Sequence, residues 1–579
     1  MKQPDNNQLN NLRHSAAHLL AAAVMELYPA AKRTIGPAIE NGFYYDFDFG
    51  DIKMSEEDLP KIEKKMHDIV KDWKNFDRIE IDSNVAMKQF SNNEYKQELI
   101  QEFSEDGQKL TLYKSGEFVD LCRGGHIDNP DKELKHFKLL KLAGAYWRGS
   151  EKNKMLTRIY GTAFPTKEEL DKYLWQLEEA EKRDHKKIGR ELELFMFHQT
   201  APGMPYWLPK GVIMYNELIN FWREEHKKRG YVEIATPLIN KKDLYVTSGH
   251  WDHYKENMFI SETEEGEIYG LKPMNCPNAM VVFGSKTRSY RDLPMELSDT
   301  DTLHRFELSG TLNGLLRVRE FRQDDAHIFC TEEQIKQEVL EIFDIAEVFY
   351  SVFNIKYKFR LGTRPENFMG DLKVWDKAEE SLKEILDESA KEYFVGEKEG
   401  AFYGPKIDIL MQDALGREWQ TGTIQLDFQI PSRFKLTYAA EDGSEKTPVV
   451  IHRVIYGSLE RFIGVLIEHL AGNLPLWLAP VQVIILPIAD RHLEYASSVN
   501  RELRTVNIRS EIDSRAETLS AKIRDAQMQK IPYMIVIGDK EIESGKLSVR
   551  SRDQGDLGSM DLKKFQQDIK IEIEEKRLK

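Results

Sequence analysis

The chain has little cysteine, no long apolar run and no excess of positive charge. Its three cysteines, Cys122, Cys276 and Cys330, are too few for a disulfide framework and are typical of a reducing compartment. The polar start MKQPDNNQLNNLRH lacks the apolar core of a secretory signal, and the early run HLLAAAVMEL is too short to span a membrane. These absences predict a soluble cytoplasmic protein.

Acidic residues outnumber basic ones. The 82 Lys and Arg against 97 Asp and Glu give a net charge of −15, which argues against a protein that coats nucleic acid without specificity. A specific nucleic-acid partner, bound at local patches, stays open. The apolar fraction of 41% is ordinary for globular protein. The length predicts about three to five domains.

The pattern along the chain divides it into three parts. Residues 1–185 combine helical and strand-like patterns and end in one long polar helix at 166–192, typical of a connector. Residues 193–478 mix strands and helices. Residues 479–579 follow the order β-α-β-α-β, which predicts a parallel sheet with helices packed on it. The fold class is therefore α+β and α/β multidomain.

A lone cysteine stands in LKPMNCPNAM, and two distant histidines have settings that suit a metal. Cys276 is that cysteine; His327 lies in FRQDDAHIFC and His452 in VVIHRVIYG. Zinc prefers thiolate and imidazole ligands, and a catalytic zinc keeps one position open. No short-range zinc signature applies here, so residue types alone also allow a buried structural cysteine.

A second group of histidines and cysteine lies near the N-terminus. His14 and His18 are four residues apart and would share one helix face. Cys122 and His126 lie in LCRGGHI, where two glycines allow a tight turn. Two interpretations stay open: a second metal site, or helix histidines unrelated to a loop cysteine.

Ordered motifs over nearly the whole chain resemble the threonyl-tRNA synthetases, a family of class II aminoacyl-tRNA synthetases. They include RHSAAHLL, GPAIENGFYYDFD, LKPMNCPN, HRFELSGTLNGLLRVREFRQDDAHIF, GAFYGPKIDI, IHRVIYGSLERFIGVL and PYMIVIGDKEIESGKLSVR. The resemblance implies an N-terminal α+β editing domain, a class II catalytic core built on an antiparallel sheet, and a C-terminal α/β anticodon-binding domain. It implies activation of L-threonine with ATP, transfer to tRNA(Thr) and hydrolysis of seryl-tRNA(Thr).

The resemblance also assigns residues to the catalytic core. It implies one Zn²⁺ per subunit at Cys276, His327 and His452. Threonine would contact Met274, Gln323, Asp325, Tyr403 and Ser458. ATP with Mg²⁺ would contact Arg305, Glu307, Arg317, Phe321, Lys406, Gln420 and Arg461. The catalytic residues would be Arg305, Arg461 and His250, the last near the transfer step.

Zinc and editing have a common chemical reason. Threonine and valine are near-isosteres, and a site that binds the hydroxyl directly rejects the analogue without it by about 10⁴–10⁵. Serine keeps the hydroxyl and lacks only one methyl group. A missing methyl group lets a site discriminate against serine by only about 10–200-fold, so a separate site that hydrolyses the wrong product is needed. The resemblance places that site at His14, His18, Lys96, Asp120, Cys122 and His126. We expect it to be metal-free in the resting enzyme.

The remaining implications concern tRNA and assembly. Glu541 and Arg550 match positions that read the anticodon, and Pro237 in EIATPLIN matches the motif at the interface of a homodimer. The chain departs from the usual pattern at Asn278 and Ala279, which replace Gly-His, at Asn313, and at Ala516. His14 comes so early that we expect no N-terminal ubiquitin-like (TGS) domain. Alternative functions are a non-catalytic paralogue that binds tRNA or mRNA as a regulator, and a stand-alone editing hydrolase.

Overall fold

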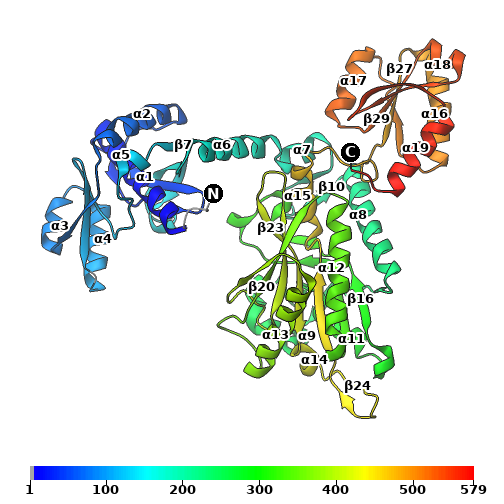
Figure 1. Ribbon diagram of the computed structural model, residues 1–579, viewed down its shortest axis with the longest axis horizontal. Helices are drawn as coiled ribbons and strands as arrows, with labels where there is room; N and C mark the ends of the chain where they lie inside the picture. The colour runs from blue at the N-terminus through cyan, green and yellow to red at the C-terminus, as the bar shows by residue number, and fades with distance from the viewer. Residues whose placement is uncertain (1–5, 108, 579) are drawn as a thin grey trace. The chain divides into compact units, whose positions relative to one another are not determined.

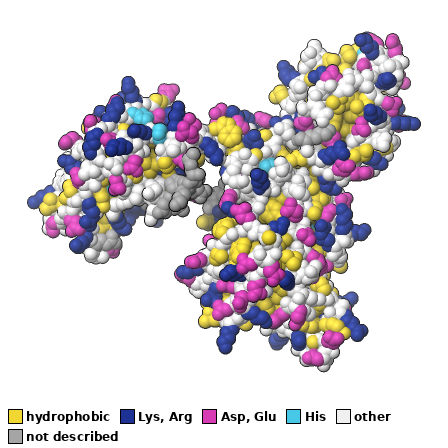
Figure 2. All heavy atoms as spheres, in the orientation of Figure 1, with side chains coloured by type: hydrophobic (Ala, Val, Ile, Leu, Met, Phe, Trp, Pro, Cys, Tyr) yellow, Lys and Arg dark blue, Asp and Glu magenta, His cyan; other side chains and the backbone are white. Residues whose placement is uncertain are grey.

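The computed structural model describes residues 6–107 and 109–578. The chain forms two compact units, Met1–Glu178 and Glu179–Lys579 (Figure 1). On the face drawn in Figure 2, acidic and basic side chains are interspersed. Within the described ranges, no helix combines the length and the apolar character that a membrane crossing requires.

The first unit is an α+β domain in which a buried helix packs on a sheet. Helix α1 (Asn6–Leu27) contains an alanine-rich stretch in its second half. The side chains of this stretch are buried on nearly all sides of the helix, as expected for a helix in the core. It packs against β3 (Gly42–Asp48) and β8 (Met155–Phe164) in a sheet of order β1-β3-β8-β7. The other elements of this sheet and its cover are β1 (Lys32–Arg33), β2 (Ala38–Ile39), β7 (His136–Tyr146) and α2 (Leu59–Ile69).

A smaller sheet completes this unit. It has the order β4-β5-β6 and lies beside two short helices. The elements are β4 (Asp77–Ile81), β5 (Leu110–Ser115), β6 (Phe118–Leu121), α3 (Ser83–Gln89) and α4 (Glu94–Glu105). Strand β6 is followed directly by the Cys122 segment, which therefore runs from this sheet toward α1.

The prediction of one helix over 166–192 is wrong. The segment forms α6 (Lys167–Lys182) and α7 (His185–Glu191), and the backbone of Asp184 between them is not helical (φ −51°, ψ 115°). The Asp184 carboxylate accepts a hydrogen bond from the Lys186 N–H, which caps α7 as a new helix. A polar helical pattern does not show such a break, because Asp is tolerated within helices.

The second unit is built on an eight-stranded sheet, which confirms the antiparallel core. Its order is β11-β16-β19-β26-β23-β22-β20-β21, and every pair is antiparallel except β11–β16 and β20–β21. The strands are β11 (Val232–Glu233), β16 (Met295–Asp299), β19 (Asp325–Cys330), β26 (Val449–Val454), β23 (Glu418–Asp427), β22 (Lys406–Gln412), β20 (Lys356–Gly362) and β21 (Tyr393–Gly396). Its larger helices are α8 (Pro209–Lys228), α12 (Ile335–Ser351), α13 (Leu372–Ser389) and α15 (Leu459–His469).

Side-chain alternation in β19 decides what faces the site. Ala326, Ile328 and Cys330 enter the main hydrophobic core. Because successive residues of a strand point to opposite faces, Asp325 and His327 point away from that core. Phe329, on the same face, packs in a separate apolar cluster with residues of α11 (Cys276–Phe283).

The C-terminal part confirms the predicted β-α-β-α-β order. Strand β27 pairs in parallel with β28 and β29, and the sheet continues antiparallel through β30 and β31, which were not predicted. The elements are β27 (Val483–Pro487), α16 (Leu493–Thr505), β28 (Ser510–Ile512), α17 (Leu519–Met528), β29 (Tyr533–Ile537), α18 (Asp539–Ser544), β30 (Leu547–Ser551), β31 (Gly555–Met560) and α19 (Leu562–Glu574).

Candidate functional sites

Strand register brings the predicted metal ligands together. His327 of β19 and His452 of β26 are direct partners in the antiparallel ladder. Cys276 begins α11, which packs over the same face of the sheet through its apolar side. The ligand atoms of these three residues all lie within 4.8 Å of one another.

The chemistry of these three side chains fits a metal ion. Both ring nitrogens of His327, and Nδ1 of His452, are buried without a hydrogen-bond partner within the described part of the chain. The other nitrogen of His452 lies 2.9 Å from Asp427 Oδ2, the carboxylate partner that metal-bound imidazoles usually have. Burial, with the charges of Asp325 and Asp427, raises the pKa of the Cys276 thiol, so its thiolate needs a nearby cation.

A cavity of about 240 Å³ opens beside this cluster. Cys276 and His452 line it, and so do six other residues that the sequence singled out: His250, Met274, Arg305, Gln323, Asp325 and Tyr403. Asp325 accepts a hydrogen bond from the Asn275 amide at 3.2 Å. Burial raises the pKa of Asp325, while the neighbouring His452 and the hydrogen bond from Asn275 favour its carboxylate form, which can accept a further hydrogen bond.

The neighbouring Asp324 has a structural role. It is fully buried, and its carboxylate accepts hydrogen bonds from the backbone N–H groups of Ile455, Tyr456 and Gly457 at 2.9 to 3.1 Å. These bonds fix the turn between β26 and α15. The two adjacent aspartates thus have different tasks, one holding the backbone and one facing the cavity.

Three predicted arginines converge near the loop 308–317. The Arg461 guanidinium donates from Nε to the Leu316 carbonyl at 2.9 Å. Burial lowers the pKa of Arg461, and the charges of Arg305 and Arg317 lower it further. Three positive charges that lie near one another suit a polyanionic ligand. Arg317 itself pairs with the Glu307 carboxylate at 2.8 Å.

The other predicted nucleotide residues have partners within the protein. The Arg305 guanidinium lies 5.0 Å from the centre of the buried Phe321 ring. Lys406 Nζ and Gln420 Nε2 both reach the buried Asp408 carboxylate, at 3.1 and 2.8 Å. None of Phe321, Lys406, Gln420 or Ser458 lines the 240 Å³ cavity. Ser458 instead caps α15, where its hydroxyl accepts from the Arg461 N–H at 3.2 Å.

The N-terminal histidines and cysteine also meet. Cys122 Sγ lies 3.4 Å from Nε2 of both His14 and His126. His14 Nδ1 lies 3.2 Å from the Gly125 carbonyl, which can only accept, so Nδ1 carries the proton and Nε2 keeps its lone pair. Burial lowers the pKa of His14, and burial together with His14 lowers that of His126 to about 3. The cluster therefore holds neutral imidazoles at pH 7.

A buried carboxylate organises the floor of this cluster. Asp120 is 1% exposed and lies 2.8 Å from Lys96 Nζ, which is 2% exposed, and 3.0 Å from Arg33 Nε. Tyr45 donates its hydroxyl to Asp120 at 2.5 Å, and His18 Nδ1 is 3.7 Å away. Above this floor, His14, His18, Cys122 and His126 each offer one nitrogen or sulfur atom that could bind a metal. These four atoms lie within 4.8 Å of one another, so the geometry also allows a metal ion.

Sequence reasoning missed several of these contacts. Arg33 and Tyr45 join the Asp120 floor, and Asp427 supports His452; their segments carry only ordinary strand patterns. At the departure Asn278 the amide nitrogen donates to Asn240 at 3.2 Å, while its buried Oδ1 has no hydrogen-bond partner among the described residues. Glu541 and Arg550 lie in α18 and β30, and the Glu541 carboxylate accepts from the Gly538 N–H at 2.9 Å.

Family models match three stretches of the chain. Residues 259–470 match the tRNA synthetase class II core domain (G, H, P, S and T), and residues 482–571 match an anticodon binding domain. Residues 110–160 match the threonyl and alanyl tRNA synthetase second additional domain. The last match contains Asp120, Cys122 and His126.

Relatives and solved structures show the same likeness. The chain is 53% identical to the threonine–tRNA ligases of Thermotoga petrophila and Clostridium botulinum strain Okra, over 98% of this chain and 88% and 89% of theirs. It is also similar to the crystal structure of the RNA binding domain of threonyl-tRNA synthetase from Cryptosporidium parvum Iowa II. That likeness has 44% identity and a TM-score of 0.65, over 67% of this chain and 98% of the other.

Proposed function

This chain belongs to the threonyl-tRNA synthetase family, and we propose on that premise which of its residues perform each step. The enzyme activates L-threonine with ATP and transfers the threonyl group to tRNA(Thr). Its N-terminal domain supplies hydrolytic editing.

We propose that Cys276, His327 and His452 hold one zinc ion, which when bound supplies a Lewis-acidic position for the amino and hydroxyl groups of threonine. The observation that carries this is the cross-strand pairing of His327 with His452: among the described residues, both ring nitrogens of His327 and Nδ1 of His452 are buried without a hydrogen-bond partner. Asp325 accepts the substrate hydroxyl, while Gln323 and Tyr403 orient the amino acid from the cavity wall. Metal analysis, paired with ATP–pyrophosphate exchange on threonine, serine and valine, tests this.

In the activation step the protein aligns two anions and balances charge. Arg305 borders the cavity and is placed to hold the threonine carboxylate and the α-phosphate. Arg317 and Arg461 would hold the rest of the triphosphate, and Mg²⁺ that enters with ATP would balance part of its negative charge. When ATP binds, Arg317 would exchange Glu307 for phosphate, which frees that carboxylate to accept from the adenine amino group. His250, buried at the cavity wall and 2.8 Å from the Ser248 hydroxyl, is placed for the transfer step.

In editing, we propose that the neutral imidazoles of the N-terminal cluster transfer protons during the hydrolysis of seryl-tRNA(Thr). His14 carries its lone pair on Nε2, where the Cys122 thiol lies at 3.4 Å, so a water that takes the place of this contact can give its proton to Nε2. Lys96 and Asp120 form a rigid buried ion pair that holds this floor in place. The ester of seryl-tRNA would be attacked by that water, releasing serine and intact tRNA.

Replacing His14 by alanine should separate the two activities. The variant should keep threonine-dependent pyrophosphate exchange, because the activation residues lie in the other unit. Its hydrolysis of seryl-tRNA(Thr) should fall by about 10²-fold or more, the usual worth of a general base. Release of labelled serine from purified seryl-tRNA(Thr) measures this. Unchanged hydrolysis would remove His14 from the mechanism; His67→Ala, on α2 of the same unit, is the control.

Assembly and location complete the proposal. We propose a cytoplasmic homodimer that reads the anticodon with Glu541 and Arg550. Val232 and Ile239, which flank Pro237, are 59% and 58% exposed, and such apolar side chains suit an interface between copies. None of the three cysteines forms a disulfide, which suits a reducing compartment. Sedimentation equilibrium of the Ile239→Lys variant against the parent tests the dimer.

A further inference from the structure

His185, the first residue of α7, joins three separate segments through one buried ring. It is 1% exposed. Its Nε2 accepts a hydrogen bond from the Leu315 N–H at 3.0 Å, and its Nδ1 lies 2.7 Å from Glu468 Oε1. A backbone N–H can only donate, so Nε2 is unprotonated and Nδ1–H donates to Glu468. The next residue, Lys186, donates to the Asn313 side chain at 3.2 Å.

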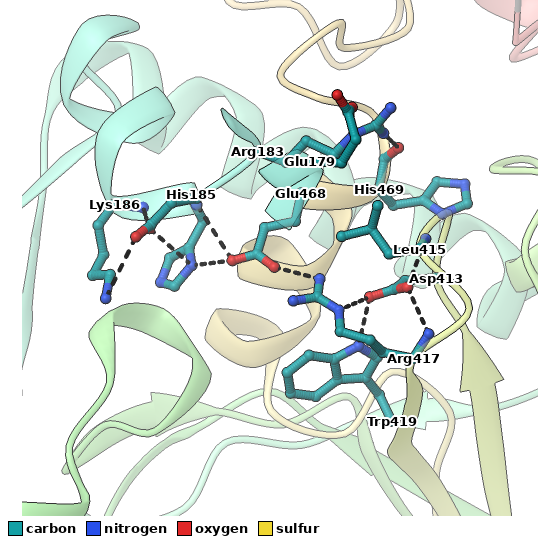
Figure 3. Close-up of polar contacts among 11 residues, drawn as sticks. Glu179, Arg183, His185, Lys186, Asp413, Leu415, Arg417, Trp419, Glu468 and His469 are labelled. Carbon is teal, nitrogen blue, oxygen red and sulfur yellow. Dashed lines mark hydrogen bonds and ion pairs between the residues drawn. The ribbon is translucent and has the colours of Figure 1, made fainter. Parts of the chain in front are cut away.

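The Glu468 end of this chain of contacts is firmly anchored. Figure 3 shows the Glu468 carboxylate between His185 and Arg417, with Asp413 and Trp419 beyond. Arg417 donates to Glu468 Oε2 and to Asp413 Oδ2, each at 2.6 Å, and the Trp419 indole donates to the same Asp413 oxygen at 2.9 Å. Burial would raise the pKa of Glu468, but the hydrogen bonds from His185 and Arg417 outweigh burial and lower it. Glu468 is thus a fixed carboxylate that orients the ring.

The Leu315 end leads directly to the proposed ATP site. Leu315 donates its N–H to the imidazole, the Leu316 carbonyl accepts from Arg461, and Arg317 follows. Gly314 has φ +50°, and a Cβ there would lie 2.2 Å from the imidazole Nε2. Only glycine permits the loop to approach the ring this closely. The position of the imidazole therefore determines the path of the backbone at residues 314–317. This stretch carries Arg317 and provides the carbonyl that holds Arg461.

We propose that His185 is a positioning residue for adenylation: by accepting the Leu315 N–H, it holds loop 308–317 in the conformation that presents Arg317 to ATP. This rests on the proposed role of Arg317 in binding the triphosphate. His185 touches no substrate. Nor does the Asp184, His185 and Glu468 group need a metal, because both nitrogens of the ring and both oxygens of Glu468 already have protein partners.

Two isosteric variants separate positioning from stability. In His185→Gln the side-chain carbonyl can take the place of Nε2 and still accept the Leu315 N–H. In His185→Asn the amide takes the place of Nδ1, keeps the bond to Glu468, and leaves the Leu315 N–H unpaired. Each variant loses one buried hydrogen bond, so both should lower Tm to a similar extent. Only His185→Asn should raise the KM for ATP in threonine-dependent pyrophosphate exchange, by about tenfold.

The outcomes decide between the alternatives. Gly314→Ala should resemble His185→Asn, because its methyl displaces the loop from the ring, and the KM for threonine should change in none of the three. A KM for ATP that rises equally in the Gln and Asn variants, or in neither, overturns the proposal. The Arg317→Ala variant tests the premise that Arg317 binds the triphosphate of ATP. If that variant keeps the parent KM for ATP, the assignment of Arg317 fails; if its KM rises while that of His185→Asn does not, only the role of His185 fails.

Discussion

Cys276→Ala protein should contain no zinc and should lose threonine-dependent pyrophosphate exchange by about 10³-fold or more. The thiolate is one of only three protein ligands, so its removal leaves two imidazoles that cannot hold the ion at ordinary concentrations. Without the ion the site loses its contact with the threonine hydroxyl. In sites of this kind such a contact favours the substrate with the hydroxyl over the analogue without it by about 10⁴–10⁵. Metal analysis of the purified protein and kcat/KM for threonine and valine measure both effects.

Cys330→Ala is the matched control for this variant. Cys330 lies at the end of β19, three residues from His327, but it faces the main hydrophobic core and is fully buried there. Its replacement should cost some stability through a small cavity and leave zinc content and selectivity unchanged. Full threonine-over-valine selectivity in the Cys276→Ala protein, or activity in a preparation free of transition metal, would be incompatible with the metal proposal.

Asp120→Ala should destabilise the first unit by about 3–5 kcal/mol. Lys96 and Asp120 are both almost completely buried, so removal of the carboxylate leaves an ammonium group in the interior without its counter-charge. Burial already lowers the pKa of Lys96, and Asp120 is the main group that opposes this. Denaturant unfolding of the full chain, followed by tryptophan fluorescence, gives the loss of stability. Hydrolysis of seryl-tRNA(Thr) should be abolished in parallel.

Two further variants show that the effect arises from a buried charge. Glu94→Gln breaks an ion pair with Lys32 in the same unit, but both partners are well exposed, so the cost should stay below about 1 kcal/mol. The double variant Lys96→Met, Asp120→Asn removes both charges and should recover part of the stability lost in Asp120→Ala. If Asp120→Ala unfolds within 1 kcal/mol of the parent, the buried pair does not organise this domain. Pyrophosphate exchange at 25 °C should be unaffected in all of them.

Local pattern sufficed for the regular elements and failed where a boundary depends on distant contacts. The C-terminal β-α-β-α-β order follows from apolar periodicity, which short-range geometry imposes on any segment that buries one face. The break between α6 and α7 does not, because His185, the residue that begins α7, is held by Glu468, a partner 283 residues away. The extra strands β30 and β31 were missed because their short, glycine-containing segments have little periodicity.

The sequence by itself determined the chemistry available to this protein. It gives the thiol, imidazole, guanidinium and carboxylate groups, and it places them in motifs whose order along the chain resembles the family. Tertiary structure alone decided which of them meet. Register pairs His327 with His452, and the pleat turns Asp325 into the cavity while Asp324 caps a turn. Spacing along the chain carries no such information, because a sheet brings residues together through backbone hydrogen bonds that are the same for every side chain.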